Sequence, residues 1–285
     1  MKKVFVLSAI FAFAVLCGEG FKPSVAGFPT KGSDYLVDTS GMTVATRFRC
    51  TDPDFVHATV EEGSFAEYLL NLPLKPHGTP CHYYDGEEKA WPYTAAVVDM
   101  DIDNADLQQC ADAVMRLRGE YFFATRQYSK MHFNFTNGFC CDFKTWAEGS
   151  RVGIKGNKTW WQSGAAQKDY SYANFRKWML LVFKYAGTLS LSRELKKASI
   201  EDVQIGDVLM QGGSPGHCEI IVDLYKNPKT REVKMMLAQS YMPAQEIEIL
   251  LNDDMSPWHT VSYDQDIIET QSWFFPINSV MRFAD

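Results

Sequence analysis

One thiol and one imidazole are the groups in this sequence best placed to do chemistry. Cys110 opens a segment whose apolar residues recur at helical spacing, and His217 follows a Gly-rich turn and begins a β-branched stretch. A helix N-terminus favours a thiolate, and an imidazole at a strand end can accept and return a proton at neutral pH. Such a pair could attack a carbonyl. Each residue also has a purely structural interpretation, because unpaired cysteine is common in cores and a histidine can simply cap a strand.

A pair of hairpin turns must position the histidine. Residues 207–211 are apolar and β-prone, residues 212–216 read Gly-Gly-Ser-Pro-Gly, and residues 217–224 are β-branched. A second turn then leads to a return strand over residues 233–241. The pattern predicts an antiparallel arrangement in which a central strand begins at His217.

The thiol must be positioned by a helix. Asp106 fits an N-cap with Gln109 at the third helical position, and the helix is predicted to run to about Tyr128. Along one face of this helix runs a single apolar stripe, formed by Leu107, Cys110, Val114, Leu117 and Tyr121. Further helices are predicted after Ser64 and over residues 172–189, and further strands over residues 81–84, 93–102, 245–250, 273–275 and 281–283.

This order of elements, a cysteine-opened helix followed by a sheet with a histidine-opened strand, resembles the papain-like cysteine hydrolases and, within them, the NlpC-type cell-wall amidopeptidases. The resemblance implies an α+β fold in which the cysteine helix packs on an antiparallel sheet. It also implies that Cys110 is the nucleophile, that His217 is the base and then the acid, and that Gln239 or Ser240 orients the imidazole.

The same resemblance implies an oxyanion site at the start of the helix. The backbone N–H of Cys110 would hold the oxyanion, helped by Gln108 or Gln109.

Over nearly its whole mature length the sequence is also similar to an uncharacterised family of exported bacterial proteins, known only as a domain of unknown function. The segments that carry this likeness are SFAEYLLNLPLKPHGTP, DLQQCADAVMRLRGEYFFA, HFNFTNGF, NFRKWMLLVFKYAGTLSL, GDVLMQGGSPGHCEIIVD and LAQSYMPAQ. This second resemblance implies no activity, so the catalytic hypothesis depends on the site itself.

Other chemistries have weaker signals. Residues 212–216 match a Gly-x-Ser-x-Gly nucleophile elbow, but that motif needs a helix after the serine, where the sequence predicts a strand. Asp99, Asp101 and Asp103 alternate at a strand end and could bind calcium or act as glycosidase carboxylates, although solvation and capping explain them too. No zinc or phosphate-binding motif occurs, so no metal and no cofactor is predicted.

Tryptophans offer a non-catalytic alternative. Trp160 and Trp161 are adjacent in a segment predicted to be an exposed loop, and Trp258 lies in a later loop. Aromatic rings of this kind can bind glycan or peptide, or can anchor a core. The alternative prediction is therefore a glycan- or peptide-binding envelope protein on a papain-like fold.

Composition and the N-terminus indicate the compartment. The chain has 285 residues, 46% of them hydrophobic, and a formal charge of −7, which disfavours nucleic acid as a partner. Residues 1–20 have the basic and apolar regions of a secretory signal peptide, with Cys17 open to lipidation. We expect an extended leader over residues 21–46 and a single α+β domain over residues 47–285, with no transmembrane span in the mature protein.

Six cysteines follow Cys17, and in an exported protein an even number permits disulfides. A bridge between Cys50 and Cys81 is one such pairing. Together these observations predict an exported protein of the periplasm or cell surface, tethered through Cys17 if that residue is lipidated. The predicted activity is a cysteine amidase or peptidase that acts on peptide or amide bonds of the cell envelope.

Overall fold

The computed structural model describes residues 28–284. The predicted signal peptide and Cys17 lie outside these residues. The helices are α1 (Val44–Arg47), α2 (Phe65–Leu70), α3 (Cys110–Ala124), α4 (Phe143–Ala147), α5 (Tyr172–Tyr185) and α6 (Thr188–Glu194), with 3₁₀ turns η1 (Tyr128–Lys130), η2 (Ile200–Asp202) and η3 (Ile277–Ser279). The strands are β1 (Tyr35–Val37), β2 (Phe48–Cys50), β3 (Val56–His57), β4 (Thr94–Val97), β5 (His132–Asn134), β6 (Cys140–Asp142), β7 (Arg151–Lys155), β8 (Lys158–Gln162), β9 (Lys196–Lys197), β10 (Val208–Gln211), β11 (His217–Asn227), β12 (Glu232–Gln239), β13 (Glu248–Leu250), β14 (His259–Ser262), β15 (Ile267–Glu269), β16 (Phe274–Pro276) and β17 (Val280–Arg282).

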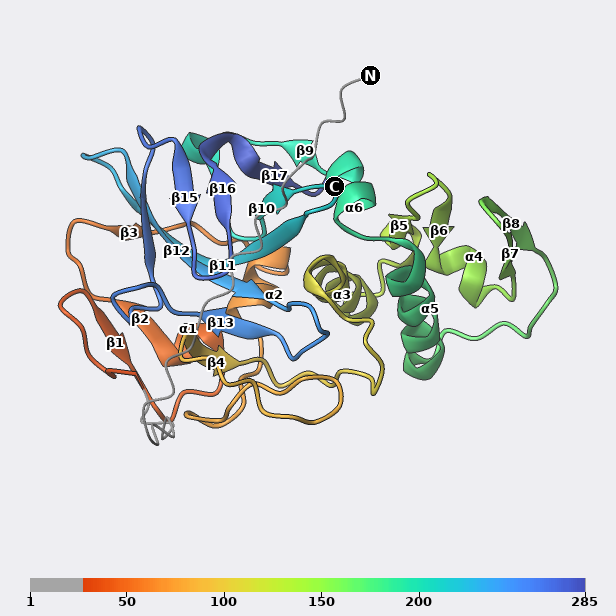
Figure 1. Cartoon of the computed structure of the whole chain (residues 1–285), viewed down its shortest axis with the longest axis horizontal. Coiled ribbons are helices and arrows are strands. Elements are labelled where there is room, and N and C mark those ends of the chain that lie inside the picture. Colours follow the sequence, from red (N-terminus) through yellow and green to blue (C-terminus); the bar gives the residue numbers. More distant parts are fainter. Residues whose placement is uncertain (1–27, 285) are drawn as a thin grey trace, which may run out of the picture.

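A nine-stranded antiparallel sheet organises the molecule. Its main path runs β4-β13-β12-β11-β10-β17-β9, while β14 also pairs with β12 and β3 pairs with β11. In Figure 1 this β-rich part is followed, beyond α3, by a smaller part that contains α4, α5 and the hairpins β5–β6 and β7–β8. The structure is therefore mixed α and β with antiparallel sheets, as the sequence predicts.

The predicted double hairpin is confirmed. Gln211 pairs with His217 across the first turn, and Asn227 pairs with Glu232 across the second. Gly213 has φ +117°, a left-handed conformation that glycine adopts without steric cost. The turn chemistry of the sequence thus places His217 at the first residue of the central strand.

The helix that carries the thiol begins later than predicted. Asp106 does not cap it, because its carboxylate accepts hydrogen bonds from the Gln109 side chain (3.0 Å) and from the backbone N–H of Ala244 (2.7 Å). The backbone N–H of Gln109 instead donates to Asp112 (3.0 Å), and the helix starts at the next residue. Cys110 is therefore the first residue of α3, which packs against β11 through buried apolar side chains.

The leader predicted over residues 21–46 differs from the structure in its described part. Tyr35 and Val37 on β1 are buried in the main core, as is Val44 at the start of α1. The alternating residues 245–250 predict a strand at the edge of the sheet, but β13 lies inside the sheet between β12 and β4. Within residues 28–284, no helix is long and apolar enough to cross a membrane.

Candidate active site

Cys110 lies half-buried at the N-terminus of α3, where the first backbone N–H groups of a helix have no intrahelical partner. Hydrogen bonds from the Cys218 thiol and the His217 imidazole to its sulfur, together with the charge of His217, lower the pKa of Cys110 to about 4 although burial opposes the shift. A further hydrogen bond comes from the backbone at Ala111. At neutral pH this sulfur is a thiolate.

Cys218 is a fully buried neighbour of the nucleophile that sequence reasoning did not single out. Burial and the hydrogen bond to Cys110 raise its pKa well above the usual thiol range. Cys218 therefore stays protonated and donates its S–H to the Cys110 thiolate. Its place directly after His217 on a strand that faces α3 is the only signal of this role in the sequence.

His217 is 2% exposed and is enclosed by aromatic rings. Its ring centroid lies 5.0 Å from that of Tyr241, 5.4 Å from that of Trp273 and 6.0 Å from that of Phe275. Burial alone lowers the pKa of His217, but hydrogen bonds to Cys110 and Glu219 and their negative charges outweigh it and raise the pKa to about 9. The imidazole and the thiol thus form a thiolate–imidazolium pair in a mostly apolar setting.

Gln239, at the end of β12, fixes which nitrogen of His217 faces the sulfur. Its side-chain oxygen lies 2.7 Å from His217 Nε2, and its side-chain nitrogen donates to the carboxylate of Glu248 at 3.1 Å. A carboxylate here accepts hydrogen bonds, so the amide nitrogen must face Glu248 and the amide oxygen must face the histidine. His217 Nε2 is therefore the donor to Gln239, and Nδ1 is the nitrogen that remains for Cys110.

Gln239 is in turn held by a buried ion pair. Glu248 is fully buried, and its carboxylate accepts from Lys89 Nζ (2.5 Å), Thr94 Oγ1 (2.6 Å) and Gln245 Nε2 (2.9 Å). A hydrogen-bonded chain thus runs from Lys89 through Glu248 and Gln239 to His217.

Replacing Gln239 by leucine is expected to lower the pH at which His217 loses its proton, about 9 in the natural protein, by about 1–2 units. The change leaves the buried His217 N–H without an acceptor, a loss of about 1–3 kcal/mol that falls on the charged form of the ring. Histidine-ring NMR titration of the two proteins would measure it. An unchanged His217 midpoint would show that Gln239 does not support the charged imidazole.

The structure places Ser240 and Gln109 away from the roles that the resemblance implies, and Gln108 in a buried position near the thiol. The Ser240 hydroxyl lies 2.7 Å from the carbonyl oxygen of Gln108, so it ties the end of β12 to the approach to α3 instead of contacting the imidazole. The Gln109 side chain is engaged by Asp106. Gln108 is buried, its oxygen accepts from Arg116 (3.2 Å), and its side-chain nitrogen has no partner among the described residues. The N–H of Cys110 and this amide are the candidate oxyanion donors.

The three tryptophans do not form one surface. Trp258 is 1% exposed and packs against Tyr225, which leaves it no face for a ligand and corrects its assignment as a binding residue. Trp160 is 41% exposed on β8, and Trp161 beside it is half-buried against Phe139. Figure 1 shows the β7–β8 hairpin on the far side of α4 and α5 from β11 and α3.

The alternative chemistries lack the geometry they need. The residues after Ser214 form strand β11 and no helix, which excludes the nucleophile elbow. Asp103 is paired with Arg176 at 2.5 Å. Within residues 28–284, no group of three His, Cys, Asp or Glu side chains is arranged to hold a metal ion. All cysteines that the structure describes are free thiols, so the bridge proposed between Cys50 and Cys81 is not formed here.

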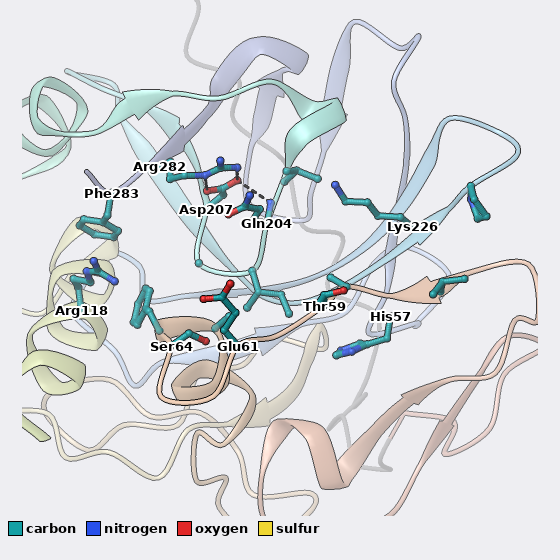
Figure 2. A pocket seen from close by; sticks show the side chains of 18 residues that line it. His57, Thr59, Glu61, Ser64, Arg118, Gln204, Asp207, Lys226, Arg282 and Phe283 are labelled. Carbon is teal, nitrogen blue, oxygen red and sulfur yellow. Dashed lines mark hydrogen bonds and ion pairs between the residues drawn. The ribbon is translucent and has the colours of Figure 1, made fainter. Parts of the chain in front are cut away.

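A separate cavity of about 750 Å³ lies at the opposite end of β11, beside Lys226 (Figure 2). Two of its charged side chains are already paired, Arg282 with Asp207 at 2.6 Å and His57 with Asp223 at 2.7 Å. Neither half of the thiol–imidazole pair is among its described lining residues. This cavity is therefore distinct from the candidate active site.

Fold and site together define a mixed α and β protein with a thiolate–imidazolium pair between a helix N-terminus and a central antiparallel strand. A family model described as a domain of unknown function, DUF4846, matches residues 44–282, and the chain belongs to this family. No curated protein and no solved structure matches it.

Proposed function

We propose that this protein is a cysteine amidase or peptidase. The observation that carries the proposal is the contact of a thiol at the first residue of a helix with an imidazole whose other nitrogen is held by Gln239. Nucleophile, base and orienting group are the three parts that covalent hydrolysis of an amide requires.

The expected reaction has two stages. The Cys110 thiolate attacks the carbonyl carbon, and the N–H at the start of α3 stabilises the oxyanion that forms. The His217 imidazolium then gives its proton to the leaving amine, and a thioester remains on Cys110. In the second stage the neutral imidazole takes a proton from water, which attacks the thioester and releases the acid.

The pH dependence follows from the two groups. The thiolate is present above the pKa of Cys110, about 4, and the acid that protonates the amine is lost above the pKa of His217, about 9. We therefore expect a bell-shaped profile of kcat/KM with limbs near these two values. A single ascending limb near pH 8.5, the ordinary thiol value, would contradict the ion pair.

The proposed substrates are peptide or amide bonds of the cell envelope, with peptidoglycan stem peptides as the first choice. This part of the proposal depends on export, which is indicated only by the sequence of residues 1–20. The test is to incubate the mature protein with peptidoglycan fragments and identify products by mass spectrometry. Cleavage that is lost in Cys110→Ala and kept in Cys140→Ala, a change of an exposed thiol, would support the proposal. Iodoacetamide labelling of Cys110 only at ordinary thiol pH, with no cleavage, would overturn it.

A second candidate function is non-catalytic binding of glycan or peptide. The exposure of Trp160 at the edge of the β7–β8 hairpin favours it, since an exposed ring can stack on a sugar or an apolar side chain. It predicts saturable binding without turnover, kept in Cys110→Ala and lost when Trp160 and Trp161 are both replaced by alanine.

A further inference from the structure

Most buried carboxylates within residues 28–284 have an identifiable charge partner. Four of them contact a cationic side chain: Glu248 with Lys89, Asp207 with Arg282, Asp223 with His57, and Glu246 with Lys75. Asp112 differs, because it accepts the N–H of Gln109 at the start of α3 and burial raises its pKa well above the usual range. Charged groups inside a protein are tolerated when they are paired, and the raised pKa of Asp112 favours its neutral form, so each of these cases is accounted for.

Among residues 28–284, no lysine or arginine forms an ion pair with the buried carboxylate of Glu219. Glu219 is fully buried, its Oε1 accepts a hydrogen bond from Thr270 Oγ1 at 2.7 Å, and its Oε2 has no partner among the described residues. The cationic atom that lies near it is His217 Nε2, at 3.5 Å from Oε1. One neutral hydroxyl cannot compensate a buried negative charge, whereas an imidazolium at this distance can.

Gln239 cannot supply that charge. It accepts the Nε2 hydrogen at 2.7 Å and so sets the direction of the ring, but its amide is neutral. Glu219 lies two residues after His217 on the same strand, so both side chains project from the same face of β11. The imidazole thus has one partner for its orientation and another for its charge.

We propose that Glu219 is a positioning residue that keeps His217 in its imidazolium form, and so keeps the pair as thiolate and imidazolium in place of thiol and imidazole. Its catalytic meaning rests on the proposed function, but the protonation of the pair can be measured without a substrate. Charge at this position would explain why a glutamate, and not an apolar residue, occupies the third position of β11, where the neighbouring residues are buried.

The sign of the effect decides which measurement is diagnostic. The charge of Glu219 stabilises the imidazolium and repels the thiolate, so it raises the pH at which each loses its proton. The titration midpoint of Cys110 is therefore a poor readout, because removal of Glu219 also removes its repulsion of the thiolate and so lowers that midpoint. Deprotonation of the imidazolium responds directly, and removal of a charge within about 4–6 Å should lower its midpoint by about 1–3 pH units. Other titratable groups that face the pair are Asp112, Cys218 and Tyr241, and none of them is replaced in the variant. Besides burial, the charge of Glu219 also raises the pKa of Cys218 and of Tyr241, so both values should fall when that charge is removed.

The experiment is a histidine-ring NMR titration of the full mature protein and its Glu219→Gln variant. Glutamine keeps the shape of the side chain and an oxygen for Thr270 but removes the charge. The signal of His217 is assigned from its absence in His217→Gln. We expect its alkaline midpoint, near pH 9 in the natural protein, to fall by about 1–3 units in Glu219→Gln.

Asp223→Asn is the matched control, because Asp223 is a buried carboxylate on the same strand that pairs with a different histidine. It should lower the midpoint of His57, whose pKa is raised chiefly by the hydrogen bond to Asp223, and leave His217 unchanged. An unaltered His217 midpoint in folded Glu219→Gln would overturn the inference. If that variant does not fold, Glu219→Asp takes its place, because the shorter side chain keeps the charge but holds it farther from His217. The midpoint of His217 should then fall by less, and no fall would overturn the inference.

Failure of this inference and failure of the proposed function give different results. A shifted His217 midpoint in a protein that cleaves no amide would support the role of Glu219 and contradict the proposed hydrolase activity. Cleavage by Cys110 with an unshifted midpoint would support the hydrolase activity and contradict the role of Glu219.

Discussion

Replacement of His217 by alanine is expected to raise the pH at which Cys110 becomes a thiolate from about 4 to near the ordinary thiol value of about 8.5. The variant keeps the hydrogen bond from Cys218, the largest cause of the low pKa, but burial of the sulfur opposes that bond, and the hydrogen bond and positive charge of His217 are gone. The same change removes the base and acid of the proposed reaction. Loss of positioned proton transfer lowers rates by about 10²- to 10⁴-fold, and kcat/KM should fall at least that far.

The measurement is the rate of iodoacetamide alkylation of Cys110 between pH 3.5 and 10, with the modified cysteines identified by mass spectrometry. His57→Ala serves as the control, since that imidazole is bound to Asp223 at the other end of β11 and should leave the profile of Cys110 unchanged. A midpoint that stays near pH 4 in His217→Ala would assign the acidity of the thiol to Cys218 and the helix N-terminus alone.

Local features of the sequence predict the elements that bear the two reactive groups. The turn that ends in Gly216 and the β-branched run after it place His217 at the start of a strand, and the structure agrees. Helical spacing after Leu107 predicts α3, and its ends differ: the helix begins at Cys110 and stops at Ala124, short of the predicted Tyr128. These signals are readable because turn geometry and hydrophobic periodicity depend on residues that are close in the chain.

Contacts between segments that are distant in the chain could not be predicted from such local patterns. Trp273 and Phe275 enclose the imidazole from a hairpin more than fifty residues downstream, and nothing in their own segment marks them for that place. Trp258 has the composition of an exposed loop around it, yet tertiary packing buries it against Tyr225. Glu219 carried a usable signal, because a charged residue two positions after His217 on a buried strand must share its face.

Lys89→Met is the prediction with the largest expected effect on stability. The side chains of Lys89 and Glu248 are 9% and 0% exposed, and methionine would keep the length of Lys89 without its charge. The remaining donors to the Glu248 carboxylate are the neutral groups of Thr94, Gln239 and Gln245. Breaking a buried pair on one side costs about 3–5 kcal/mol, because the other charge stays buried without compensation. Urea denaturation at pH 7 should show a loss of this size.

The double variant Lys89→Met with Glu248→Gln separates the stabilising role of this pair from its role in orienting Gln239. Removal of both charges should restore most of the lost free energy of unfolding. A glutamine at position 248 can donate as well as accept, however, so it no longer forces the amide oxygen of Gln239 toward His217. We therefore expect stability to recover while the pH at which His217 loses its proton falls below its value in the natural protein. Lys229→Met, which breaks an exposed pair with Asp54, should cost less than about 1 kcal/mol. An equally small loss in Lys89→Met would show that the buried pair does not support the site.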